Sequence, residues 1–150
     1  MVHYAQGDLL ASDCNYICHQ VNCQARMGSG IAKSIREKWP AVYDMYMQVA
    51  KPDCLGSIQT VFICGNIPIQ GVINMFAQEN YGYDGRRYTS YDAFWSCLEQ
   101  IKEFAPKGSK IGFPYCIGCG LGGANWKVIS SMIEAALGEE YEVYIYQLEG

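Results

Sequence analysis

Charged residues are scarce in this sequence, making up 17% of its 150 residues, against roughly a quarter in an average globular domain. The net charge of −4 leaves no excess of basic residues, and duplex nucleic acid is normally bound by a basic face. The composition therefore argues against binding of duplex nucleic acid. It does not exclude a local pocket that binds a small anion. Half of the residues are hydrophobic, which is enough for one core and argues against disorder.

Long apolar runs are also lacking. The amino terminus reads MVHYAQGD, without a basic region before an apolar stretch, so we expect no signal peptide. The longest apolar stretches have only the length of strands, so we expect no membrane span. These features predict a cytoplasmic single domain over residues 1–150, and its compact length is compatible with a monomer.

Cysteine is abundant instead, with eight residues. Without a secretion signal we interpret them as reduced thiols, and Cys18, Cys64 and Cys116 fall in apolar, strand-like runs where cysteine acts as a small hydrophobe. Cys116 and Cys119 have CxxC spacing, but a zinc site would need a second pair. A redox motif stays open as an alternative, because this stretch loosely follows a strand. We expect neither a metal nor a cofactor.

Six short runs rich in β-branched and aromatic residues predict strands. They are Val2–Gln6, Tyr16–Val21, Ile58–Cys64, Gly71–Ala77, Lys110–Tyr115 and Tyr141–Leu148.

Three stretches between these runs have helical periodicity. In the first, an apolar face precedes Pro40, which ends the helix or restarts it as a segment over 41–49. In the second, Thr89 is the expected N-cap, with Asp92 three residues later. The buried stripe expected for the second helix is Tyr91, Phe94, Trp95, Leu98 and Ile101. In the third, Asn125 is the expected cap and Gly138 the stop.

Strands that alternate with helices predict an α/β fold, with a mostly parallel or mixed sheet covered on both faces. Ligands of such folds bind beyond the carboxyl ends of the strands, where loops lead into helices. Two glycine-rich loops are expected there, namely 27–31 (MGSGI) and 117–123 (IGCGLGG). Glycine lets backbone N–H groups approach a ligand, and a helix N-terminus adds partial positive charge. Either loop alone is as well explained by a tight turn, but two together favour a diphosphate site.

Further short motifs follow one another in a set order. They are GDLL at 7–10, HQVNC at 19–23, MGSGIA at 27–32, FAQE at 76–79 and PYCIGCGL at 114–121, with Trp126 beyond. In this order they resemble the macrodomain family over nearly the whole chain. The resemblance implies a three-layer fold in which helices flank a mixed, mostly parallel six-stranded sheet. It is strongest toward the branch of terminal ADP-ribose glycohydrolases and ADP-ribose 1''-phosphate phosphatases.

The resemblance also implies a ligand, ADP-ribose or a close derivative. Asp8, followed by Leu9, matches the aspartate that accepts a hydrogen bond from the adenine amino group, and Asn22 matches the asparagine beside the distal ribose. An N-cap and a turn asparagine are the respective alternatives. The remaining matched positions are Met27, Gly28, Ser29, Gly30 and Ile31 around one phosphate, and Gln78, Ile117, Gly118, Cys119, Gly120, Leu121 and Gly122 around the other phosphate and the distal ribose.

The same resemblance leaves catalysis open. Glycohydrolases of this branch use a lysine and an aspartate, whose positions fall on Gln78 and Gly122 here, and both departures argue against that covalent mechanism. The phosphatase branch carries a histidine that corresponds to His19, which can act as a general acid or base. A satisfied core histidine is an equally good interpretation of His19. The chain is expected to bind ADP-ribose or a derivative and to hydrolyse a bond at C1'' of its distal ribose, in ADP-ribose 1''-phosphate, O-acetyl-ADP-ribose or an ADP-ribosylated carboxylate. The alternative is a module that binds ADP-ribose without turnover.

The polar, aromatic segment 78–88 is typical of a functional loop. Its acidic residues can order water, its arginines can neutralise phosphate and its tyrosines can cover a ligand. We expect at least one of these residues to touch the ligand; the alternative is a solvated loop whose charges pair locally. The residues concerned are Glu79, Tyr81, Tyr83, Asp84, Arg86, Arg87 and Tyr88.

Overall fold

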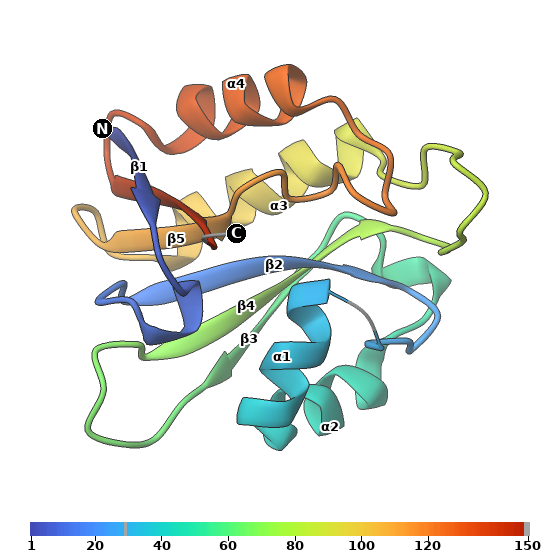
Figure 1. The fold of residues 1–150 in the computed structure, drawn as a ribbon, viewed down its shortest axis with the longest axis horizontal. Helices are drawn as coiled ribbons and strands as arrows, with labels where there is room; N and C mark the ends of the chain where they lie inside the picture. The colour runs from blue at the N-terminus through green and yellow to red at the C-terminus, as the bar shows by residue number, and fades with distance from the viewer. Residues whose placement is uncertain (29, 149–150) are drawn as a thin grey trace.

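A computed structural model describes residues 1–28 and 30–148. Its six strands form one sheet in the order β1-β6-β5-β2-β4-β3 (Figure 1). The strands are β1 Val2–Gln6, β2 Tyr16–Asn22, β3 Ile58–Phe62, β4 Gly71–Gln78, β5 Lys110–Pro114 and β6 Glu142–Gln147. Strand β3 runs antiparallel to its neighbour, β4, and the other pairs are parallel. The expected mixed, mostly parallel six-stranded sheet is confirmed.

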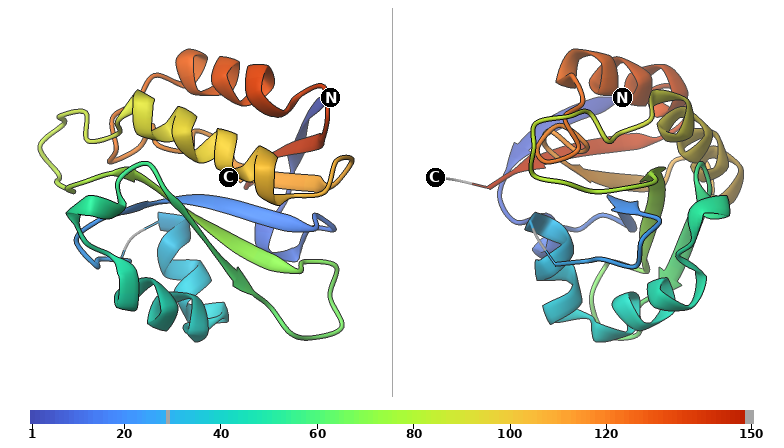
Figure 2. Two further views of the ribbon diagram at one scale, coloured as in Figure 1. Left: turned by 180° about the vertical axis from the view of Figure 1, so that it is seen from behind. Right: turned by 90° about the vertical axis from the view of Figure 1, so that its right-hand side faces the viewer.

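Helices cover both faces of this sheet. They are α1 Gly30–Lys38, α2 Pro40–Val49, α3 Tyr91–Phe104 and α4 Trp126–Leu137, with short 3-10 helices η1 Leu9–Ala11 and η2 Pro52–Cys54. α1 and α2 pack on one face, whereas α3 and α4 pack on the other (Figures 1 and 2). Each face has its own apolar core, because the strands present side chains to both layers. The three-layer α/β architecture is therefore as expected.

The helix boundaries agree with the sequence patterns except at α3. Pro40 restarts the chain as the first residue of α2, and Asn125 caps α4 by accepting a hydrogen bond from the Lys127 N–H at 2.8 Å. The expected cap of α3, Thr89, is wrong, because Ser90 takes this role. The expected burial of Trp95 is also wrong, since this side chain is 36% exposed.

Two cysteines expected inside strands lie outside them. Cys64 is exposed beyond the end of β3, and Cys116 follows β5 in a turn with φ of +60°. Cys18 is fully buried in β2, as expected, and all eight cysteines are free.

No helix in the part of the chain that the structure describes is both long and apolar enough to cross a membrane.

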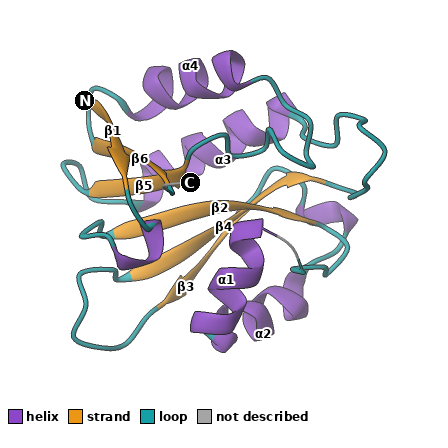
Figure 3. Ribbon diagram, viewed as in Figure 1, coloured by secondary structure: helices purple, strands orange, loops and turns teal. Residues whose placement is uncertain are grey.

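The five parallel strands end at one edge of the sheet, at Gln6, Asn22, Gln78, Pro114 and Gln147. The long loops that follow β2, β4 and β5 lie at this edge (Figure 3). Folds of this kind bind their ligands at this edge of the sheet.

Candidate functional site

Three adjoining hollows of about 310, 300 and 360 Å³ lie along this edge. The first and middle hollows share the start of α1 and the end of β5, while the middle and last share Gln20, Gln78 and Leu121. Their shared lining residues place them in a row, here called the groove, which crosses the sheet from β1 and β6 to β2 and β4. Three hollows in a row suit an elongated ligand that has three chemically different parts.

The first hollow contains Asp8. One carboxylate oxygen of Asp8 accepts a hydrogen bond from the Leu10 N–H at 2.9 Å, so this residue is the N-cap of η1. The same residue lines the hollow beside Leu9, Tyr146 and apolar side chains of α1 and β5. The hollow thus pairs a carboxylate with apolar and aromatic walls, an arrangement that suits a flat ring with a polar edge.

The middle hollow lies between the two glycine loops. On one side the first turn of α1 begins at Gly30, whose φ is +59°. On the other side stands the 117–123 loop, in which Gly118 has φ of +76° and no atom lies within 4 Å of a Cβ built at Gly120. The first turn of α1 supplies N–H groups without helical partners and a partial positive charge. Both expected loops therefore face one space, which suits an anionic group.

Not every predicted loop position lines the middle hollow. Ser29 lies outside the described residues. Cys119 lines none of the three hollows, whereas its neighbours Ile117, Gly118 and Gly120 line the middle one. Met27 is buried and lines the last hollow.

Asn22, in the last hollow, is tied into its own turn. Its side-chain oxygen accepts hydrogen bonds from the Gln24 N–H at 2.9 Å and from the Tyr46 hydroxyl at 2.9 Å, and its Nδ2 donates to the Arg26 carbonyl at 2.8 Å. Tyr46, fully buried on α2, also receives the Arg26 N–H at 3.1 Å. Burial raises the pKa of the Tyr46 phenol, so it stays a neutral donor. Through Tyr46, α2 therefore stabilises the conformation of the turn that begins at Asn22.

A chain of hydrogen bonds joins the last hollow to the middle one. Gln20 donates through Nε2 to the Gln78 Oε1 at 2.7 Å and to the Thr89 hydroxyl at 2.8 Å. The Thr89 hydroxyl donates to the Gly118 carbonyl at 2.8 Å. Strands β2 and β4, the residue before the α3 cap and the 117–123 loop are thereby fixed to one another.

His19 lies elsewhere. It is fully buried, lines none of the three hollows, and donates through Nε2 to the side-chain oxygen of Asn74 on β4. Asn74 in turn donates to Gln59 on β3 at 3.0 Å. Burial lowers the pKa of the His19 imidazole to about 4. Of the two interpretations of His19, this placement favours the core histidine. It is not fully satisfied, because its buried Nδ1 has no hydrogen-bond partner among the described residues.

The Macro domain family model matches residues 18–133 of the sequence. This chain is a macrodomain.

Its relatives agree with this assignment. A "DNA ADP-ribosyl glycohydrolase" of Mycobacterium tuberculosis is 23% identical over the whole macrodomain, which spans only 43% of that relative's length. The solved macrodomain of Mycobacterium tuberculosis DarG superposes with a TM-score of 0.82 at 23% identity and covers 97% of both chains. Thermosipho africanus DarTG, solved in complex with ADP-ribose, gives a TM-score of 0.75 at 22% identity over 94% of this chain and 40% of that one. These structural likenesses support the fold.

The macrodomain has no room for an aspartate at Gly122. A Cβ built there would lie 2.5 Å from the Thr89 hydroxyl oxygen and 2.6 Å from the Gly118 carbonyl oxygen. The chain of hydrogen bonds through Gln20 thus occupies the place where the resemblance puts the glycohydrolase side chain. Gln78, which the resemblance puts at the lysine position, belongs to the same chain of hydrogen bonds.

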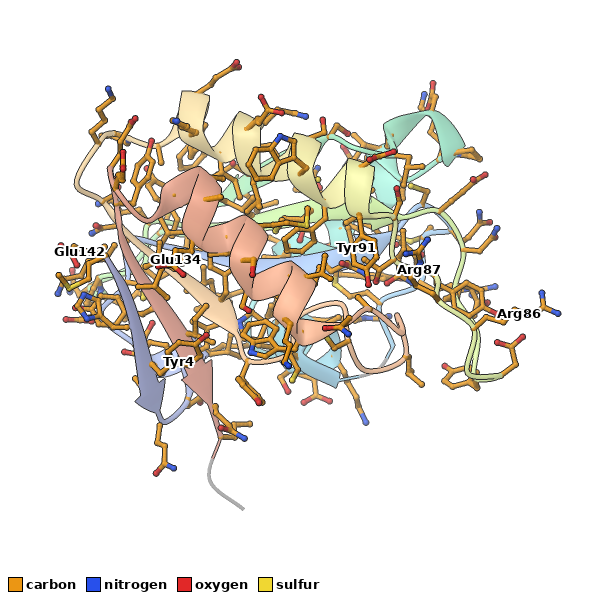
Figure 4. The ribbon with its side chains drawn as sticks, turned by 90° about the horizontal axis from the view of Figure 1, so that it is seen from above. Tyr4, Arg86, Arg87, Tyr91, Glu134 and Glu142 are labelled. Atoms are coloured by element: carbon orange, nitrogen blue, oxygen red, sulfur yellow. The ribbon has the colours of Figure 1, made fainter. Side chains whose placement is uncertain are left out.

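The loop that follows β4 in this macrodomain contributes Tyr81, Gly82 and Tyr83 to the last hollow. Its arginines do not line the groove. Figure 4 shows Arg87 beside Tyr91, with its guanidinium carbon 4.5 Å from the ring centroid, and Arg86 extending outward.

Local pairing also shapes the tip of this loop. Asp84 forms an ion pair with Arg86 at 3.2 Å and accepts a hydrogen bond from the Tyr88 hydroxyl at 2.8 Å. Charge pairing of this kind is what the solvated-loop alternative predicts. Of the loop's charged and aromatic side chains, Tyr81 and Tyr83 are the ones that line the last hollow.

Sequence reasoning overlooked Gln20, Thr89 and Tyr46. Gln20 stood inside the HQVNC motif but carries no chemistry by itself, and Thr89 was assigned to a helix cap. Tyr46 is one of 12 tyrosines, and only its hydrogen bonds to Asn22 distinguish it. Among the described residues there is also no group of three or more potential metal ligands.

Proposed function

We propose that this macrodomain binds ADP-ribose or a close derivative along the groove. The observation that carries the proposal is the row of three adjoining hollows, which passes from a carboxylate in an apolar hollow, between two glycine loops, to the Asn22 turn. A nucleoside, a diphosphate and a second sugar need these surroundings in this order. The Thermosipho africanus relative was solved with ADP-ribose as its ligand, which supports the same choice.

The proposed ligand has a definite direction in the groove. Asp8 accepts from the adenine amino group through the carboxylate that also caps η1. The first turn of α1 and the 117–123 loop take the two phosphates through backbone N–H groups. The distal ribose then lies in the last hollow, between Asn22 and the tyrosines of the loop after β4.

Binding without turnover is the function that the geometry supports best. The described residues that line the last hollow include two arginines and three tyrosines as their ionisable groups, and no carboxylate, histidine or lysine. Hydrolysis at C1'' needs a group that accepts or donates a proton near neutral pH. Hydrolysis remains the second candidate because the mycobacterial relatives are named glycohydrolases.

Calorimetric titration with ADP-ribose tests the binding proposal, and AMP is the matched control because it lacks the second phosphate and the distal ribose. We expect micromolar affinity for ADP-ribose and a clearly weaker affinity for AMP. Absence of heat and of any shift in thermal unfolding at millimolar ADP-ribose would refute the proposal.

A substrate panel decides between the two candidates. It contains ADP-ribose 1''-phosphate, O-acetyl-ADP-ribose, a protein ADP-ribosylated on carboxylates and, because of the relatives' name, ADP-ribosylated DNA. Mass spectrometry detects release at C1''. We expect no turnover of any of them alongside retained binding; multiple turnovers of one substrate would establish the hydrolase instead.

A further inference from the structure

Two arginines line the last hollow, Arg26 in the turn that begins at Asn22 and Arg36 on α1. Both residues are exposed to solvent. The described residues that line this hollow include no acidic side chain, and neither guanidinium forms an ion pair with a described residue. The last hollow therefore carries two positive charges for which the described part of the protein supplies no partner.

The position of the Arg36 guanidinium is defined by Tyr43 on α2. The guanidinium carbon lies 3.6 Å from the centroid of the Tyr43 ring, which is a cation–π contact. Both residues line the last hollow and also a neighbouring hollow of about 560 Å³ between α1 and α2, which lie side by side on one face of the sheet (Figure 1). The stacked guanidinium therefore lies where these two hollows adjoin, and its N–H edges stay available to an anion.

The neighbouring hollow differs from the last hollow in its charges. Its lining residues include Glu37 and Asp44, which are acidic, together with Lys33 and Arg36. Neither acidic residue lines the last hollow. An anionic group is therefore favoured in the last hollow, on the side of Arg26 and Arg36, and less favoured beyond it.

ADP-ribose by itself does not provide an anion at this place. In the proposed binding mode its diphosphate lies between the glycine loops of the middle hollow, and the distal ribose in the last hollow is uncharged. Two arginines beside an uncharged sugar suit a ligand that carries one more anionic group there. Arginine binds phosphate oxygens through paired, charge-assisted hydrogen bonds, and the anomeric carbon C1'' is the end of ADP-ribose that lies farthest from the adenosine.

We propose that Arg26 and Arg36 form a binding subsite for a phosphate group bonded to C1'' of the distal ribose. The inference rests on the proposed function and selects one class of ADP-ribose derivative within it. The neighbouring hollow gives the phosphate room beyond the ribose, and the arginines give it charge and donors. The protein therefore binds ADP-ribose 1''-phosphate in preference to ADP-ribose.

The test compares the dissociation constants of ADP-ribose and ADP-ribose 1''-phosphate, measured by calorimetry on the whole chain at low ionic strength, where exposed charges are least screened. We expect the wild-type protein to bind the 1''-phosphate roughly tenfold more tightly than ADP-ribose. Arg36→Gln should lose most of this preference and bind ADP-ribose within about twofold of the wild-type protein. Arg26→Gln should change the two constants in the same direction.

Arg87→Gln is the matched control for Arg36→Gln. Arg87 is also exposed and also lies over a tyrosine, with its guanidinium carbon 4.5 Å from the Tyr91 ring centroid, but it lines none of the hollows named above. The control removes the same charge and the same kind of contact elsewhere on the protein. It should keep the wild-type preference, so that a loss in Arg36→Gln reports the position of the charge.

The outcomes separate the subsite from the proposed function. Equal affinities of the wild-type protein for the two ligands, or a preference retained in either subsite variant, would overturn the subsite while ADP-ribose binding still stands. Equal weakening of both ligands in Arg36→Gln would also overturn it, because the arginine would then act on the diphosphate. Failure of the wild-type protein to bind either ligand would overturn both proposals.

Mass spectrometry of the recovered ligand shows whether the 1''-phosphate stays intact during the titration. If the wild-type protein hydrolyses it, the same comparison is made on KM. Arg36→Gln should then raise KM roughly tenfold and Arg87→Gln should leave it unchanged. An unchanged KM in Arg36→Gln would overturn the subsite.

Discussion

The buried position of His19 should make the protein lose stability in mild acid. Burial lowers the pKa of this imidazole from its ordinary value of 6.5 to about 4, whereas in the unfolded chain it returns to near 6.5. As the pH falls below 6.5, His19 becomes protonated in the unfolded state but stays neutral in the folded state. Stability therefore falls with pH and the loss stops near pH 4, where both states are protonated.

The size of the effect follows from the same two values. One pKa unit corresponds to about 1.4 kcal/mol, so the interval from 6.5 down to pH 5 costs about 2 kcal/mol of the free energy of unfolding. The carboxylates with shifted pKa values are Asp13, Asp84, Glu140 and Glu142, all lowered. Their contributions are lost only as the pH falls through about 4 and below, so the window from pH 7 to pH 5 isolates the histidine.

Urea unfolding at pH 7, 6 and 5 measures this loss. His19→Gln keeps a donor for Asn74 and removes the titration, so its stability should be nearly flat across the window, whatever its value at pH 7. His3→Gln is the control, because His3 is the other histidine and lies near the surface beside Glu142; this variant should keep the wild-type slope. A flat wild-type profile, or the same slope in His19→Gln, would refute the reasoning.

Three further predictions concern the groove. Gly122→Ala should lower the free energy of unfolding by about 1–3 kcal/mol, because the new Cβ would lie 2.5 Å from the Thr89 hydroxyl oxygen. The Cβ of Gly28→Ala would meet no atom within 4 Å, so this variant should lose less stability. Chemical denaturation of the two variants measures the difference. Tyr46→Phe should cost about 1–3 kcal/mol, since it leaves buried hydrogen-bonding groups without their partner, and should also weaken ADP-ribose binding in calorimetry. Asp8→Asn keeps a helix cap but loses the carboxylate, so it should weaken AMP and ADP-ribose alike by roughly tenfold, while Asp13→Asn, at an exposed ion pair, should weaken neither.

Each of these predictions can fail in its own way. Equal stability losses for the two glycine variants would show that the Cβ contact at Gly122 is relieved at no cost. A stable Tyr46→Phe protein with normal affinity would remove the role of α2 in shaping the Asn22 turn. A loss of ADP-ribose affinity in Asp8→Asn without a loss of AMP affinity would place the adenine elsewhere.

The fold could be predicted well because its signals are local. Strand-length apolar runs alternate with helical periods, and a cap such as Asn125 marks its helix through its own side chain. The errors arose where two neighbouring residues compete for one role. Thr89 and Ser90 are both good caps, and only the approach of the 117–123 loop decides that Thr89 turns toward the Gly118 carbonyl instead.

The position of the candidate groove could be predicted from the sequence, but the arrangement of its side chains could not. Glycine loops and the order of the motifs place the groove at one edge of the sheet, because parallel strands bring their carboxyl ends together. The side on which β2 residues project could not be predicted, since this central strand is buried on both faces and lacks polar alternation. His19 and Gln20 are adjacent in sequence, yet one projects into the core toward Asn74 and the other toward the groove.

The pairing of β1 with β6 has a consequence for how this chain folds. β1 is made first during synthesis, but its partner in the sheet is β6, as in the register of Val2 with Val143. The hollow beside Asp8 therefore lacks the part of its wall that Tyr146 and Gln147 provide until β6 has been made, while β2, β3 and β4 can pair earlier. Contacts so distant along the chain form slowly, so the end of the groove that contains Asp8 is expected to form last.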